Sequence, residues 1–325
     1  MYPARSRFVV GLRSAALVVA LGCIGAMAAI SSSAAKTHSI PLTYRQTSGT
    51  RPYVPVQLNG TPLLLMLHAN AGFAVMTTHA NAAKAGITDL VSEGQYGINA
   101  PGQLSPLGRA HAVAKTFQVG HRLDHDLKIS VFEVPQDPPI DGMIGITWLK
   151  DAKALVDYGN DRLLLPESDL DIQAEHTRLR KQGYVAHPMT WDAADRRYTV
   201  SPSVNGVAGK FVVSTVADIW IDAPFAQRAG IALAPTAESF GGPTGATGEV
   251  RSTQGELGMV LDGQPLRSAK GSVMDLYDYD DEPRPADTST WRSGYLGCDF
   301  MRANQAVIDF ASGLLFIKAE PSAHR

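Results

Sequence analysis

Short apolar runs separated by Gly, Pro, Asn and Asp make up most of this chain. Runs bounded in this way by turn residues are typical of β-strands. The first half contains YVPVQL, PLLLML, HAVAKTFQV, LKISVFEV, KALVDY and RLLL, and the second half contains RYTVSPSV, KFVVST, ELGMVL, GSVMDL, AVIDF and LLFI. The pattern predicts a fold built mainly of strands.

Few segments favour a helix. THANAAKAGI at 78–87 and DAPFAQRAGI at 222–231 end on Gly86 and Gly230, which suit a helix C-cap. One short helix is therefore expected in each half of the chain. A polar, helix-prone stretch at 167–183 separates the two halves, and we interpret it as a linker.

The two halves repeat one pattern. VPVQLNGTPLLLMLHANAG at 54–72 and VSPSVNGVAGKFVVSTVA at 200–217 each join two apolar runs through Asn-Gly, and the second run ends nine positions past the Asn. A second pair of segments also matches: DGMIGITWLKDAKALVDYGNDRLLL at 141–165 and SGYLGCDFMRANQAVIDFASGLLFI at 293–317. In both, the first Gly after the apolar pair lies twelve positions before an Asp. Spacing kept at both ends of two separated segments indicates a duplicated domain.

We therefore expect two lobes, at 37–166 and 184–320, related by a pseudo-twofold axis. The chain has 325 residues, 45% of them hydrophobic, which is enough for two domains with cores of their own. The second run of each repeat ends at His68 or Ser214. These two residues are expected to face each other at the axis.

The N-terminus has the order of an export signal. Residues 1–35 carry three Arg, then the apolar run 15–30, then SSSAA with small residues where signal peptidase cuts. We expect cleavage near Lys36 and a periplasmic or secreted protein. Two alternatives stay open: an uncleaved anchor, although the apolar run is slightly short for a membrane span, and a lipoprotein acylated at Cys23. Contact with a membrane is expected only through one of these alternatives.

Charge argues against a nucleic-acid partner. The formal charge of −2 becomes −5 once Arg5, Arg7 and Arg13 of the N-terminal segment are removed. A protein with this balance lacks the basic surface that phosphate backbones require.

The repeated pattern resembles the aspartic proteases, in the form of a retropepsin-like unit fused into a two-lobed, pepsin-like chain. The resemblance covers most of the chain after residue 50 and includes a hairpin Gly in the middle of each lobe, Gly120 and Gly263. It implies an all-β fold of two pseudo-symmetric β-barrel lobes, with a cleft between them and a β-hairpin flap over the cleft. In the family, each lobe contributes one catalytic Asp from an Asp-Thr-Gly triplet.

Both catalytic Asp are missing here. The triplets are His68-Ala69-Asn70 and Ser214-Thr215-Val216. The family's two carboxylates share a proton, so that one acts as base and the other as acid, and this chain supplies neither at those positions. The resemblance implies that the cleft is lined by residues at and after the triplets, namely Ala69, Asn70, Ala71, Thr215, Val216 and Ala217.

Other carboxylates have structural interpretations. Asp218 lies four residues past Ser214, and Asp222 is placed to cap a helix, so neither stands at the triplet position. Asp157 and Asp309 occupy equivalent places in the two closing strands. Their duplication indicates one common hydrogen bond inside each lobe.

No metal or cofactor is expected. His121 and His125 in GHRLDHD are interpreted as parts of a solvated hairpin, and the acidic run at 275–282 as an exposed loop. The Gly-rich segment 239–250 lacks the Gly-Lys-Ser/Thr of a phosphate loop. Cys298 is interpreted as a small buried hydrophobe, since no local motif supplies the base that a nucleophilic thiol needs.

Three functions stay open at this point. The first is a non-catalytic protein that binds a peptide or other extended ligand between the lobes. The second is a hydrolase of altered chemistry, either with Ser214 as nucleophile and His68 as base or with a recruited carboxylate. The third is a partner in a membrane or cell-wall complex, which needs no ligand between the lobes.

Overall fold

The computed structural model describes residues 37–319, except 48, 97, 101–102, 135, 242–246 and 281. These residues belong to one compact unit. The predicted signal segment 1–35, Cys23 and the predicted cleavage position at Lys36 lie outside the described residues. Within the described part of the chain, no helix is both long and apolar enough to cross a membrane.

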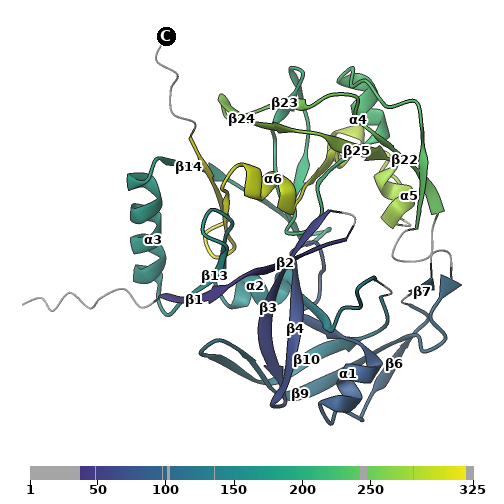
Figure 1. Ribbon diagram of the computed structural model, residues 1–325, viewed down its shortest axis with the longest axis vertical. Helices are drawn as coiled ribbons and strands as arrows, with labels where there is room; N and C mark the ends of the chain where they lie inside the picture. Colours follow the sequence, from purple (N-terminus) through teal and green to yellow (C-terminus); the bar gives the residue numbers. More distant parts are fainter. Residues whose placement is uncertain are drawn as a thin grey trace, which may run out of the picture. The chain divides into compact units, whose positions relative to one another are not determined.

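A six-stranded sheet joins the two halves of the chain (Figure 1). At its centre the two closing strands pair antiparallel, with Val156 opposite Ile308, Leu155 opposite Asp309, and Asp157 opposite Val307. Leu155 is equivalent to Val307, and Asp157 to Asp309, so the pairing is symmetric about the Val156–Ile308 pair. A pseudo-twofold axis therefore passes through that pair. In sheet order the strands are β1 (Thr37–Pro41), β13 (Arg162–Pro166), β12 (Leu155–Asp157), β27 (Val307–Asp309), β28 (Leu314–Lys318) and β14 (Tyr184–Pro188).

Each lobe contains an eight-stranded sheet, and the two sheets have equivalent strand orders. The order in lobe one is β2 (Thr43–Gln46), β3 (Thr50–Leu58), β4 (Thr61–His68), β11 (Gly142–Gly145), β5 (Val75–Thr77), β10 (Arg122–Val131), β9 (Arg109–Val119) and β6 (Val91–Gly94). The order in lobe two is β15 (Thr190–Asp192), β16 (Arg197–Val200), β19 (Phe211–Val213), β26 (Gly294–Leu296), β20 (Ile219–Asp222), β25 (Gly271–Met274), β22 (Thr247–Ser252) and β21 (Glu238–Gly241). The predicted duplication and mainly-strand fold are confirmed.

Two smaller sheets complete the strands. In lobe two, β18 (Val207–Ala208), β17 (Ser203–Val204), β23 (Leu257–Leu261) and β24 (Gln264–Ala269) form a four-stranded sheet. In lobe one, β7 (Ile98–Ala100) and β8 (Gln103–Leu104) form a two-stranded one. Gly120 and Gly263 lie at positive φ in the turns β9–β10 and β23–β24, as expected for tight hairpins.

The lobes contain more helices than the single one expected in each. The predicted pair is α1 (His79–Lys84) and α4 (Ala223–Arg228), and the predicted linker contains α3 (Asp169–Lys181). There is a second equivalent pair: α2 (Ile146–Asp151) directly follows β11, and α6 (Cys298–Ala303) follows β26 after Gly297. Like α1 and α4, these helices are only six residues long, but Lys153 and Gln305 take the positive φ after them, so no Gly marks their ends in the sequence.

The acidic run 275–282 is not the exposed loop that we expected. It contains α5 (Leu276–Asp280), whose Leu276 and Tyr277 are buried. Asp280 accepts hydrogen bonds from Arg292 and Tyr295, at 2.8 Å each. The guanidinium of Arg292 neutralises the charge of this acid and the Tyr295 hydroxyl replaces water as its hydrogen-bond donor, contacts that the spacing of the sequence does not reveal. A short 3₁₀ helix, Thr288–Thr290, follows.

The Asn-Gly turns show how exact the duplication is. Asn59 and Asn205 lie at φ of 47° and 49°, where Asn is better tolerated than most residues. Their amides donate to the last carbonyls of the adjacent helices, Ala85 O at 3.1 Å and Ala229 O at 3.0 Å. Each turn therefore also caps the helix of its lobe.

The predicted bond of the duplicated acids is present as well. Asp157 Oδ1 accepts from the backbone N–H three residues on, at Asn160, and Asp309 Oδ1 does the same at Ser312. Both acids are fully buried, and α3 contributes to both: Arg178 pairs with Asp157, and His176 bonds Asp309 at 2.6 Å.

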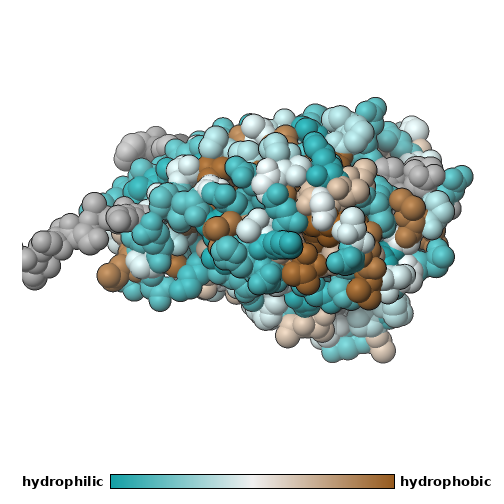
Figure 2. All heavy atoms as spheres, turned by 90° about the horizontal axis from the view of Figure 1, so that it is seen from below, coloured by the Kyte–Doolittle hydropathy of each residue, from teal (hydrophilic) through white to brown (hydrophobic). Residues whose placement is uncertain are grey.

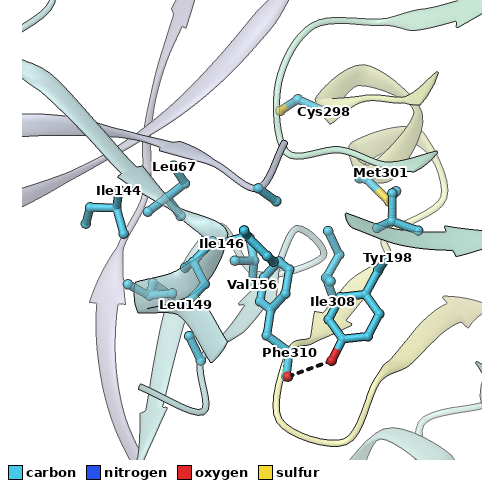
Figure 3. Close-up of a cluster of buried hydrophobic side chains, with 14 of the residues drawn as sticks. Leu67, Ile144, Ile146, Leu149, Val156, Tyr198, Cys298, Met301, Ile308 and Phe310 are labelled. Carbon is cyan, nitrogen blue, oxygen red and sulfur yellow. Dashed lines mark hydrogen bonds between the residues drawn. The ribbon is translucent and has the colours of Figure 1, made fainter. Parts of the chain in front are cut away.

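One apolar core contains residues of both lobes. Figure 3 shows Leu67, Ile144 and Leu149 of lobe one in the same cluster as Tyr198 and Met301 of lobe two. The Tyr198 hydroxyl donates to Phe310 O at 3.3 Å within it. The surface seen in Figure 2 is mainly hydrophilic, with apolar residues in small groups.

Candidate functional site

The two triplets occupy equivalent places in the two lobes. His68 is the last residue of β4, and Ser214 directly follows β19. β4 lies parallel to β11, with His68 opposite Gly145, and β19 lies parallel to β26. A Cβ at Gly145 or Gly297 would lie 2.2 Å from a carbonyl oxygen of the loop that follows the triplet. Glycine is therefore required where each loop folds over its neighbouring strand.

The triplets meet across the axis, as the duplication predicts. The Thr215 hydroxyl donates to Leu67 O at 2.7 Å and accepts from Ala69 N at 2.8 Å. Ala69 is the counterpart of Thr215 and has no hydroxyl, so this bridge exists in one direction only. The Asn70 amide adds a bond to Ser214 Oγ at 3.1 Å.

Ser214 is held in place and buried. Its hydroxyl donates to Val216 O and accepts from Val216 N, both at 3.2 Å, in addition to the Asn70 amide. The residue is only 1% exposed. A nucleophilic serine needs a base at hydrogen-bond distance, and here the neighbours of the hydroxyl are two backbone groups and an amide.

His68 is a neutral side chain at ordinary pH. Burial, Arg51 and Arg197 together lower the pKa of His68 to about 4. Its Nδ1 is buried without a hydrogen-bond partner, and no bond to Ser214 is present among the described side chains. The contact on which a His68–Ser214 hydrolase depends is therefore missing from this arrangement.

Two carboxylates lie near the second triplet, although neither belongs to it. Burial and Asp299 raise the pKa of Asp218 to about 6. Asp299, which sequence reasoning missed, accepts from Thr50 N at 3.0 Å across the lobe boundary and also bonds the Thr50 hydroxyl. The equivalent contact on the other side joins Arg196 to the Thr147 hydroxyl at 2.6 Å. The duplication could have revealed Thr147 and Asp299 as equivalent residues, since Thr147 lies two positions past Gly145 and Asp299 lies two positions past Gly297.

Arg51 is a second residue that sequence reasoning missed. It is partly buried on β3, and its Nε donates to Thr47 O at 2.9 Å. Burial lowers its pKa, while Tyr279 of lobe two and Tyr53 act in the opposite direction. Among the described residues no carboxylate forms an ion pair with Arg51. Its charge therefore acts on His68 without being neutralised by a neighbour.

The loop after Ser214 departs from its counterpart. Ala217 lies at φ 63°, a left-handed conformation that costs a residue with a Cβ about 1 to 2 kcal/mol. Its backbone is covered by Gly49, whose added Cβ would lie 2.7 Å from Ala217 Cα. Val216 packs with Tyr53 and Met66 of lobe one. An apolar contact between the lobes thus stands where the family has a glycine.

The residues expected to line a cleft fall into two groups. Ala69, Thr215, Val216 and Ala217 are at most 8% exposed, because they form the contact between the lobes. Asn70 and Ala71 are partly exposed. The triplets contain one imidazole and no carboxylate or thiol, so they do not make a metal site. Ligating side chains gather elsewhere, at His38, His121 and Glu167.

Comparisons with known proteins agree on the fold. No family model matches the chain, and no curated protein matches it. Among solved structures, the chain is similar to a retropepsin-like aspartic protease from Rickettsia conorii, with 21% identity over 40% of this chain and 91% of that one and a TM-score of 0.30.

Two solved structures match over both lobes. Basic 7S globulin from soybean shares 10% identity over 88% of this chain and 95% of that one, with a TM-score of 0.43. The aspartic proteinase from Irpex lacteus shares 11% identity over 89% of this chain and 99% of that one, with a TM-score of 0.48. The fold of the chain is aspartic-protease-like, and identities this low concern the fold alone.

Proposed function

We propose that this protein is exported and binds an extended peptide between its lobes without cleaving it. The observation that carries the proposal is the meeting of the two triplets through neutral groups only: the Thr215 hydroxyl, the Asn70 amide and the Ser214 hydroxyl. Acid hydrolysis in this fold needs two carboxylates that share one proton at that place. Export rests on the order of charges and apolar residues in 1–35.

Edge strands supply a way to hold a peptide. β6 ends the sheet of lobe one, all four of its residues are exposed, and β21 ends the sheet of lobe two. An extended peptide adds to such an edge through backbone hydrogen bonds. Figure 1 shows β7, which follows β6 in the chain, and β22, which pairs with β21, on the same side of the molecule.

Polar groups near the axis favour a ligand with an anionic group. The charge of Arg51 has no ion-pair partner among the described residues, and His68 Nδ1 and Asn70 Oδ1 are buried without partners. Asn70 Oδ1 only accepts, so a backbone N–H of a bound peptide would pair with it, whereas His68 Nδ1 can donate or accept. A free carboxylate is the group that would pair with Arg51.

Peptide binding and turnover are measured on the same untagged protein. Short random peptides are presented with a free C-terminal carboxylate or as the amide, and hydrolysis is followed from pH 3 to 8. We expect binding without turnover. Arg51→Met should weaken binding of the carboxylate peptides by roughly tenfold or more and leave the amides unchanged. The control is Arg45→Met: Arg45 lies on β2, opposite Arg51 on β3, and its substitution should leave binding of both kinds of peptide unchanged.

The enzyme alternative has its own outcomes. Turnover that is lost in His68→Ala or Ser214→Ala would replace the binding proposal with altered chemistry at the triplets. Asp218 is the carboxylate whose raised pKa and neighbour Asp299 most nearly suit a recruited acid. Turnover that is lost only in Asp218→Asn would assign the reaction to that carboxylate.

A further inference from the structure

Three metal-ligating side chains from separate segments meet on the surface of lobe one. His38 lies on β1, His121 lies in the β9–β10 turn, and Glu167 directly follows β13. His38 Nε2 is 2.8 Å from Glu167 Oε1, and the rings of His38 and His121 stack with centroids 3.4 Å apart. One ligating atom from each residue lies within 4.8 Å of the other two.

The fold itself creates this grouping. β1 pairs with β13, with His38 opposite Leu165, so His38 lies beside the chain that leads from β13 to α3 (Figure 1). The hairpin turn brings His121 to the same place from the other side. His125, the histidine nearest to His121 in the sequence, is not part of the group. A search for closely spaced histidines in the sequence therefore does not find the site.

We propose that His38, His121 and Glu167 bind one divalent metal ion of the zinc class. Two imidazoles and one carboxylate are a ligand set that zinc uses, with the fourth position left to water. His38 and Glu167 side chains are each 42% exposed, so that position is open to solvent. The cation would replace the contact between His38 Nε2 and Glu167 Oε1.

The geometry requires only local movement. Zinc–nitrogen bonds of about 2.0 to 2.1 Å demand converging ring nitrogens, so the stacked rings must rotate slightly about their side-chain bonds. Exposed side chains can do so. The bound ion would connect β1, the β9–β10 hairpin and the start of α3.

The test is calorimetric titration of the untagged, EDTA-treated protein with zinc chloride. We expect one equivalent to bind, and His121→Ala or Glu167→Gln to weaken binding by at least about tenfold, since one of three ligands is lost. His125→Ala, an exposed histidine on the same hairpin, should bind like the wild type. Zinc at a hundredfold excess over its dissociation constant should raise the Tm of the wild type by roughly 2 to 5 °C.

Two results would overturn the site. One is the absence of saturable zinc binding to a folded wild-type protein. The other is equal binding by wild type, His121→Ala and Glu167→Gln, which would place the ion elsewhere. A zinc-soaked crystal decides the location independently, by an anomalous peak within bonding distance of all three residues. None of these readouts depends on peptide binding, so failure here leaves the proposed function untouched.

Discussion

His68 links the stability of this protein to pH. In the fold its pKa is about 4, because of burial and the neighbouring Arg51 and Arg197, whereas an unfolded histidine titrates near 6.5. The unfolded chain therefore binds more protons between these values, and stability falls as the pH drops through this window, by roughly 3 kcal/mol at most. Asp218 acts in the opposite sense below pH 6, since its folded pKa is raised.

His68→Gln should therefore remove the loss of stability that His68 causes at low pH, so the variant gains stability relative to the wild type between pH 7 and pH 4.5. The contribution of Asp218 is common to both proteins, so the difference between variant and wild type isolates His68. The free energy of unfolding is measured in urea at pH 4.5 and at pH 7 for both. His125→Gln, at an exposed histidine, should follow the wild type. Parallel curves for His68→Gln and wild type would show that His68 is not neutral in the fold.

Ala217 offers a stabilising substitution. Its φ of 63° is unfavourable for any residue with a Cβ, and glycine adopts it without strain. Ala217→Gly is expected to stabilise by about 0.5 to 1 kcal/mol after the entropy gained by the unfolded chain is subtracted. The counterpart Ala71 is not among the described residues with positive φ, so Ala71→Gly should destabilise instead. Equal effects at both positions in thermal denaturation would contradict the assigned strain.

At the scale of elements, the Thr215 hydroxyl joins the end of β4 to the loop after β19. Thr215→Val keeps the shape but leaves Leu67 O and Ala69 N buried without a partner, at a cost of about 2 to 4 kcal/mol. Thr177→Val, on the exposed face of α3, should cost less than about 0.5 kcal/mol. Chemical denaturation measures both, and a cost at Thr215 as small as that at Thr177 would show that the bridge contributes little.

The features that could be predicted are those whose spacing and turn residues recur in the two halves of the sequence. The Asn59 and Asn205 turns, the Asp157 and Asp309 bonds and the meeting of the triplets follow from spacing alone. The short helices α2 and α6 were missed although they too are equivalent, because Lys153 and Gln305 follow them where Gly86 and Gly230 follow α1 and α4. Asp299 and Arg51 escaped notice because their partners, Thr50 and Thr47, are chosen by the approach of the lobes and by a local turn, not by any motif.

At the scale of the whole molecule, the two lobes are expected to unfold together. The β12–β27 pair and a core that runs through both lobes leave neither lobe with a complete set of partners on its own. Calorimetry should therefore give one transition whose calorimetric and van't Hoff enthalpies agree. Two separate transitions would show that each lobe is stable alone, and the shared sheet would then be only a docking surface.

The missing hydroxyl at Ala69 distinguishes this chain from a dimer of identical single lobes. In a dimer of identical single lobes every substitution occurs twice, so losing one threonine means losing both hydroxyls of the bridge. Only a chain that encodes each half separately can keep Thr215 while its counterpart becomes alanine. The difference between Ala69 and Thr215 therefore requires two separately encoded halves, as in this chain, where each half can carry a residue that the other lacks.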